Sequence, residues 1–101
     1  MGQPVARQGD SAAGVCTAHR SPVAWTGVID SASGGFTVDG QEAAAINDTG
    51  STSCGHRFRI IGASTILTGL GKRIARKDDP VEVIQGGSGV ITSGSPTTTS
   101  E

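Results

Sequence analysis

The fold is decided by a nine-residue stretch near the start of the chain, Gly-Gln-Pro-Val-Ala-Arg-Gln-Gly-Asp (Gly2–Asp10). It aligns without gaps with Gly-Gln-Glu-Ala-Ala-Ala-Ile-Asn-Asp (Gly40–Asp48) and with Gly-Lys-Arg-Ile-Ala-Arg-Lys-Asp-Asp (Gly71–Asp79). Each copy opens on glycine, has alanine at its fifth place and closes on aspartate. Repeats at this kind of interval indicate one supersecondary unit used several times. We therefore expect three similar structural units in one chain.

The pattern continues beyond the closing aspartates of the first two copies. Cys16 follows Asp10 by six residues, and Cys54 follows Asp48 by the same six. In the third copy this place is taken by Gln85. A functional site built on the cysteines would therefore draw its residues from only two of the three units.

The residues that precede the opening glycines repeat more loosely. Phe36–Asp39 leads into Gly40, and a similar run, Ile66–Leu70, precedes the third copy. The first copy has no such lead-in, but Val90–Ser93 leads into Gly94 near the end of the chain. We expect this last segment to supply the missing lead-in strand, so that three units close around an axis.

The composition is typical of short strands and tight turns. The 101 residues include 16 Gly, 8 Val, 8 Ile and 11 Thr, but only 2 Leu. β-branched side chains suit a pleated surface and lose rotamer freedom in helices. The net charge of −1 and the charged fraction of 17% exclude a long disordered chain and a strongly basic nucleic-acid binder. We expect one small all-β domain over residues 1–95, followed by a short low-complexity C-terminal tail over residues 96–101.

Both histidines of the chain lie within three residues of a cysteine, in the patterns Cys16-x2-His19 and Cys54-x-His56. Thiolate and imidazole are the preferred ligands of zinc, and four of them make a closed tetrahedral structural site. Ligands two residues apart on a straight strand face opposite sides, so the second pair can bind one ion only if Gly55 makes a turn. We predict a metal site formed by all four side chains.

Other interpretations of the cysteines stay open. Cys16 and Cys54 could form a disulfide, or they could be two buried thiols near surface histidines. A disulfide across this loop would stabilise the fold by about 3–4 kcal/mol, whereas a structural zinc site supplies on the order of 10 kcal/mol. An enzyme would need an open metal position or a nucleophile with a base. A site with only three protein ligands would leave such an open position for a reactive water. Nothing else in the sequence forms a catalytic motif, and we predict no catalytic residues.

A resemblance to a known family rests on the first repeat. Pro4–Arg7 reads Pro-Val-Ala-Arg, and with the flanking Gly2-Gln3 and Gly9-Asp10 it resembles the PAAR-repeat family, named for a Pro-Ala-Ala-Arg motif. The third copy echoes the motif as Arg-Ile-Ala-Arg (Arg73–Arg76), and the second only as Glu-Ala-Ala-Ala. The resemblance covers residues 2 to about 95.

The resemblance implies a small cone of short β-strands with pseudo-threefold symmetry. Proteins of this family cap the trimeric β-helical spike of contractile phage tails and of type VI secretion systems, one chain per trimer. They bind a metal, usually zinc, near the apex, with ligands that are mostly His with a Cys. Carried over by position, the ligands here would be Cys16, His19, Cys54 and His56. Two Cys and two His leave the metal identity open, with zinc first and iron second.

The same resemblance implies a non-enzymatic tip that pierces membranes and sharpens the spike. Its partner would be the trimeric spike protein, with transient contact with a target-cell membrane and no small-molecule substrate. It would be found at the tip of a virion tail spike, or exported through a type VI apparatus. The physical logic agrees, because a single chain can match a trimer only with three similar faces.

The alternative function is that of a small metal-stabilised module that binds nucleic acid. A basic run, Lys72 to Lys77, could contact phosphate, but such runs are more typical of solvated strand faces. Three aromatic residues are too few for base stacking, and we expect Trp25 in the core or facing the base of the cone. Within the repeats, the arginines and closing aspartates are candidates for structural ion pairs: Arg7 with Asp10, and Arg76 with Asp79. We expect the partner not to be nucleic acid.

Overall fold

A computed structural model describes residues 3–17, 21–63, 68–69, 72–95 and 99–100, and in these residues the protein is all-β with no helix. The fold class expected from the composition is therefore confirmed. The principal extents are 39 × 23 × 23 Å, so the molecule is elongated. The strands are β1 (Gln3–Pro4), β2 (Ser11–Cys16), β3 (Val23–Ile29), β4 (Thr37–Val38), β5 (Gln41–Glu42), β6 (Thr49–Thr52), β7 (Arg57–Ile60), β8 (Thr68–Gly69), β9 (Lys72–Arg73), β10 (Pro80–Val83), β11 (Gly87–Ile91) and β12 (Thr99–Ser100).

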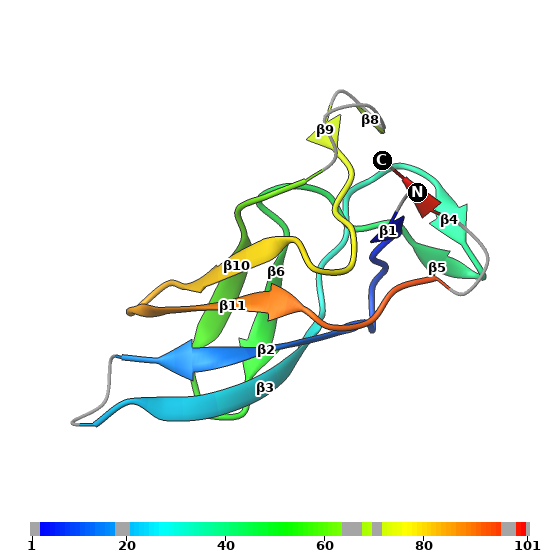
Figure 1. Ribbon diagram of the computed structural model, residues 1–101. Coiled ribbons are helices and arrows are strands. Elements are labelled where there is room, and N and C mark those ends of the chain that lie inside the picture. The colour runs from blue at the N-terminus through cyan, green and yellow to red at the C-terminus, as the bar shows by residue number, and fades with distance from the viewer. Residues whose placement is uncertain (1–2, 18–20, 64–67, 70–71, 96–98, 101) are drawn as a thin grey trace.

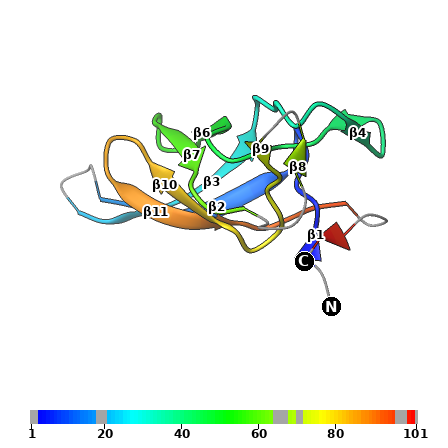
Figure 2. The same ribbon diagram turned by 90° about the horizontal axis from the view of Figure 1, so that it is seen from above.

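Six of the strands close into an antiparallel barrel in the order β10-β11-β2-β3-β6-β7, with β7 pairing back to β10. The barrel consists of three hairpins, β2–β3, β6–β7 and β10–β11 (Figures 1 and 2). Each hairpin begins at the residue that follows the closing aspartate of one repeat. The repeats therefore mark the entry of the chain into each third of the barrel.

Three two-stranded sheets, β1/β12, β4/β5 and β8/β9, accompany the three repeats. In Figure 1 their strands lie at the upper right, with both chain ends, while the hairpin tips point to the lower left. Each sheet contains one threonine at an equivalent position, and that threonine pairs with a residue of the opposite strand: Thr37 with Glu42, Thr68 with Arg73 and Thr99 with Pro4. We call this end of the molecule the base and the hairpin-tip end the apex.

The expected position of the missing lead-in strand was wrong. Val90 and Ile91 belong to β11 of the barrel, and the strand that pairs with β1 is β12, which falls within the segment 96–101. The reason is the length of chain between barrel and sheet. Thr37 and Thr99 each follow the last residue of a hairpin, Ile29 or Ile91, by eight residues, and a lead-in at 90–93 leaves no chain to cross to the base.

The three repeats meet around a common axis through their central alanines. Ala6 donates its backbone N–H to the carbonyl of Ala75, Ala75 donates to Ala44, and Ala44 donates back to Ala6, each at 2.9 Å. All three alanines are fully buried. Three chain segments converge at these fully buried positions, and close packing there favours a small side chain, in agreement with the alanine at the fifth place of every copy. This closed ring of hydrogen bonds confirms the pseudo-threefold arrangement.

The last residue of each hairpin follows the same pseudo-threefold symmetry. Ile29, Ile60 and Ile91 recur at equal intervals, are buried, and each exchanges backbone hydrogen bonds with a turn: Ile60, for example, accepts from Asn47 and donates to Asp48, both at 2.9 Å. The first hairpin is the longest of the three, because its strands β2 and β3 pair continuously from Ser11 and Val28 out to Cys16 and Val23. It therefore reaches farthest toward the apex.

The two largest buried side chains of the barrel interior are aromatic. Trp25 on β3 and Phe58 on β7 stack at 5.4 Å between ring centroids, which confirms the expected core position of Trp25. Glycines opposite the rings make room for them: a Cβ on Gly50 would lie 2.3 Å from Phe58, and one on Gly89 would lie 2.8 Å from Trp25. A second cluster, Val5, Val38, Ala43, Ala45 and Ile74 with Phe36 against it, fills the base. No helix in the described residues is long and apolar enough to cross a membrane.

Candidate metal centre

Cys16 is the last residue of β2, and its side chain is fully buried at the apex end of the barrel. The strand is fixed on both sides, because Cys16 pairs with Val23 of β3 and with Gly87 of β11. Its Sγ lies 3.3 Å from Nδ1 of His56 and 3.5 Å from the carbonyl oxygen of Gly86. The first predicted ligand therefore faces inward, toward the second Cys-His pair.

Cys54 and His56 lie on the turn between β6 and β7, and Gly55 between them has a left-handed φ of +88°. The backbone N–H of Gly55 donates to the carbonyl of Thr52 at 3.3 Å. A side chain at this φ would be strained, which is why glycine suits the position. The turn that the Cys-x-His spacing required at Gly55 is confirmed.

The hydroxyl of Thr52 holds this turn, a role that was not predicted from the sequence. Its Oγ1 accepts the backbone N–H of His56 at 3.0 Å and donates to the His56 carbonyl at 2.9 Å. The same oxygen lies 3.1 Å from Sγ of Cys54. Thr52 thus orients both ligands of the pair. The available signal was a threonine two residues before a Cys-x-His motif, a place where its hydroxyl can reach back to the turn.

The sulfur atoms of Cys16 and Cys54 and one ring nitrogen of His56 all lie within 4.8 Å of one another. Nδ1 of His56 is 3.3 Å from the first sulfur and 3.9 Å from the second. Ligand atoms of a tetrahedral zinc ion, at ordinary bond lengths, are about 3.5–3.8 Å apart. Both cysteines are free thiols, so no disulfide joins them. The three side chains fit a metal ion in spacing and in chemistry.

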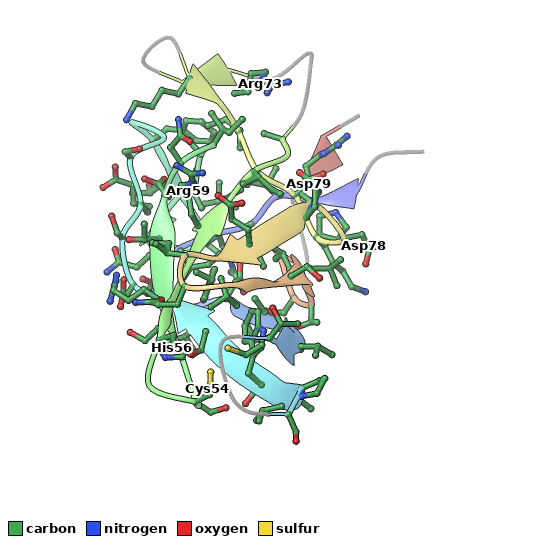
Figure 3. The ribbon with its side chains drawn as sticks, turned by 90° about the vertical axis from the view of Figure 1, so that its left-hand side faces the viewer. Cys54, His56, Arg59, Arg73, Asp78 and Asp79 are labelled. Carbon is green, nitrogen blue, oxygen red and sulfur yellow. The ribbon has the colours of Figure 1, made fainter. Side chains whose placement is uncertain are left out.

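The fourth predicted ligand, His19, lies outside the described residues. The segment that carries it joins the paired ends of β2 and β3, Cys16 and Val23. Figure 3 shows Cys54 and His56 together at one end of the molecule and Arg73 at the other. The metal-ligand group therefore belongs to the apex, and the repeats belong to the base.

The closing aspartates of the repeats form a second set of charged groups, nearer the base. Asp10 and Asp79 are buried, and each accepts hydrogen bonds from the backbone and the guanidinium of the arginine three residues before it. The expected ion pairs, Arg7–Asp10 at 3.0 Å and Arg76–Asp79 at 2.8 Å, are confirmed. The hydrogen bonds with Asp10 raise the pKa of Arg7. Of the basic run, Arg76 is therefore held by a structural partner.

The second repeat has Ala45 where the other two have arginine, so its aspartate accepts hydrogen bonds from other donors. Asp48 accepts from the backbone N–H of Ala45 at 2.7 Å and from the backbone and hydroxyl of Ser33 at 2.9 and 2.8 Å. Nζ of Lys72 donates to that hydroxyl at 3.1 Å. The lysine therefore supplies the positive charge through Ser33, and a second member of the basic run serves the fold.

The sequence matches no protein-family model and no curated protein.

Proposed function

We propose that this chain caps a trimeric β-helical spike of a contractile injection machine, a phage tail or a type VI secretion system. The observation that carries the proposal is the closed ring of backbone hydrogen bonds among Ala6, Ala44 and Ala75, which gives a single chain three similar faces. A trimer ends in three identical faces around its axis, and one chain can cover them all only if it imitates that symmetry. Capping would also cover strand edges that otherwise template aggregation.

The base is the surface that this proposal assigns to the spike. The three short sheets and both chain ends lie there, away from the hairpin tips (Figure 1). The apex is the surface that leads, and it makes transient contact with the target-cell membrane during contraction. The protein acts without catalysis and takes no small-molecule substrate and no nucleic acid. Its location is the tip of a virion tail spike, or outside the cell after export through a type VI apparatus.

The role of the metal at the apex is structural in this proposal. Cys16, Cys54 and His56 would hold it, and His19 is the fourth ligand by its spacing from Cys16. Zinc is the first choice because two thiolates and two imidazoles form a closed tetrahedral site, and iron is the second. When bound, the ion would join the first hairpin to the second at the apex end of the barrel. Thr52 and Gly55 orient two of the ligands for it.

The proposal is tested by binding to the trimeric β-helical spike protein of the same genome. Arg73, exposed on β9 at the base, is changed to Glu, and Ile84, 58% exposed at the β10–β11 turn, is changed to Ser as the matched apex control. We expect Arg73→Glu to weaken the complex in size-exclusion and surface-plasmon experiments, and Ile84→Ser to leave it unchanged. Equal affinities for the two variants, or loss only with the apex variant, would contradict the assignment of the base.

The alternative, a nucleic-acid module, is tested with the same protein. A duplex DNA and a single-stranded RNA are titrated with the chain at several salt concentrations. Phosphate binding would give an affinity that falls steeply with salt. We expect no measurable binding, and a salt-dependent complex with either probe would support the alternative.

A further inference from the structure

We propose that Cys16 and Cys54 form an oxidation site, at which a peroxide joins the two thiols into a disulfide and thereby displaces the metal. The inference deepens the proposed function, because it rests on the metal site at the apex and concerns the regulation of that site. In this proposal the first and second hairpins are linked at the apex in either of two states. In one state a metal ion links them, and in the other a disulfide bond links them.

The geometry brings together two sulfurs that belong to the first and the second hairpin. Both lie within 4.8 Å of each other and of Nδ1 of His56, which is 3.3 Å from one and 3.9 Å from the other. A disulfide has an S–S bond of about 2.05 Å, so one sulfur must move. Cys16 is fixed by pairing on both sides, with Val23 and with Gly87. Cys54 lies on the turn between β6 and β7, so its sulfur is the one that would have to move toward Cys16.

The burial of the two thiols assigns them different roles. Cys16 is buried and Cys54 is half-buried, so a small oxidant in solution reaches Cys54 first. Oxidation-sensitive cysteines combine access to solvent with a resolving cysteine nearby. Cys54 is therefore the reacting thiol, and Cys16 is the resolving one.

The reaction takes place in two balanced steps. The Cys54 thiolate attacks one oxygen of hydrogen peroxide, an S–O bond forms, the O–O bond breaks, and the leaving hydroxide takes a proton to become water. The Cys16 thiolate then attacks the sulfur of the sulfenic acid, an S–S bond forms, the S–O bond breaks, and a second hydroxide leaves as water. Two thiols are oxidised by two electrons, and one peroxide is reduced to two waters.

The oxidised state would suit a protein that leaves a reducing compartment. Thiols persist inside cells, whereas disulfides persist in oxidising surroundings. A tip that lost its metal outside the cell would open between the first two hairpins unless another link replaced it. The disulfide supplies that link between the same two hairpins.

The test uses the full chain, purified under reducing conditions and loaded with zinc. Hydrogen peroxide is added, zinc release is followed with a colorimetric chelator, and the tryptic peptides of residues 8–20 and 21–57 are examined by mass spectrometry. We expect one zinc released for each disulfide formed, and a linked pair of these peptides lighter by two hydrogens. Reductant with zinc should restore the starting state. Met1 lies in another peptide, so its oxidation does not interfere.

Two results would overturn the proposal: oxidation of Cys54 to sulfinic acid with no link to Cys16, or links only between chains. In the zinc-free chain, a thiol-alkylating reagent should modify Cys54 before Cys16, and the reverse order would contradict the assigned roles. The variant Cys54→Ser should give no linked peptides, while Thr17→Ala should behave as wild type. A chain that binds no zinc at the outset would refute the metal part of the proposed function, while disulfide formation would still be measured in that chain.

Discussion

The Asp79 carboxylate accepts two hydrogen bonds at one oxygen from a single residue, the backbone N–H of Arg76 at 2.7 Å and its Nε at 3.1 Å. Its other oxygen accepts from Nη2 of the same arginine at 2.8 Å. The aspartate thus fixes the turn that precedes β10, and the Arg76 guanidinium neutralises the buried carboxylate. Asp10 makes the same set of hydrogen bonds with Arg7. Two of the three hairpins are therefore preceded by the same arginine-aspartate turn.

We predict that Asp79→Asn lowers the free energy of unfolding by about 2–3 kcal/mol, because it weakens several charge-assisted hydrogen bonds at a buried turn. The neighbouring Asp78→Asn is the control. Asp78 is exposed and has a left-handed φ of 74°, which asparagine adopts readily, so this change should be near neutral. Urea unfolding followed by Trp25 fluorescence measures both. Equal effects would mean that the carboxylate of Asp79 does not hold the turn.

Gly89→Ala should destabilise the barrel by about 3 kcal/mol or more through overpacking. The added Cβ would lie 2.3 Å from the carbonyl oxygen of Ala13 and 2.8 Å from the Trp25 ring. Ser88→Ala, an exposed change at the neighbouring position of β11, should have almost no effect on the same unfolding curve. A well-tolerated Gly89→Ala with unshifted Trp25 emission would contradict the packing described for the two rings.

The exposed ion pair between Asp30 and Arg57 should contribute little and should depend on pH and salt. Hydrogen bonds from Arg57 and Ser51 lower the pKa of Asp30 below its ordinary value of 3.8. The folded-state pKa is therefore below the unfolded one, and the contribution is present above pH 3.8 and lost as pH falls through the folded-state value. Because both side chains are largely solvated, Asp30→Asn should cost at most about 1 kcal/mol at neutral pH.

The pH dependence of the pair is measured by thermal unfolding of wild type and Asp30→Asn at neutral pH, at low pH and in high salt. The difference between the two proteins should shrink in acid and in salt. A difference that grows as the pH falls would contradict the lowered pKa of Asp30.

Removal of the metal should open the apex and lower stability strongly. Cys54→Ser, His56→Ala and His19→Ala should each reduce zinc retention during dialysis against a chelator, with a lower melting temperature than wild type. Thr17→Ala, next to Cys16 but without a ligand group, should retain zinc fully. Retention by His19→Ala equal to wild type would leave three protein ligands, and it would refute the assignment of His19.

The threefold plan could be predicted from the sequence because it depends on backbone requirements that recur. An alanine is required at each fifth place because three chain segments converge at the axis. An aspartate is required at the end of each repeat because its carboxylate accepts a backbone N–H of the turn. The lead-in strand could not be placed correctly, because Val90–Ser93 resembles it in residue type while the crossing length decides its position. The equal spacing of Thr37, Thr68 and Thr99 along the chain was the better signal.

The metal-ligand group could be predicted in part. The spacing required a turn at Gly55, and the structure has one. That Cys16 and His56 approach to 3.3 Å could not be read from the sequence, since they lie on different hairpins whose register is set by pairing across the barrel. Thr52 escaped notice because its role depends on backbone groups that only the folded turn brings to its hydroxyl.

The most direct test of the central claim, that one chain imitates a trimer, is the native mass of the complex with the trimeric spike protein of the same genome. The account predicts one copy of this chain, carrying one metal ion, on each spike trimer. Three copies per trimer would contradict it, because each spike protomer would then bind its own copy and the ring formed by Ala6, Ala44 and Ala75 would have no symmetry to match.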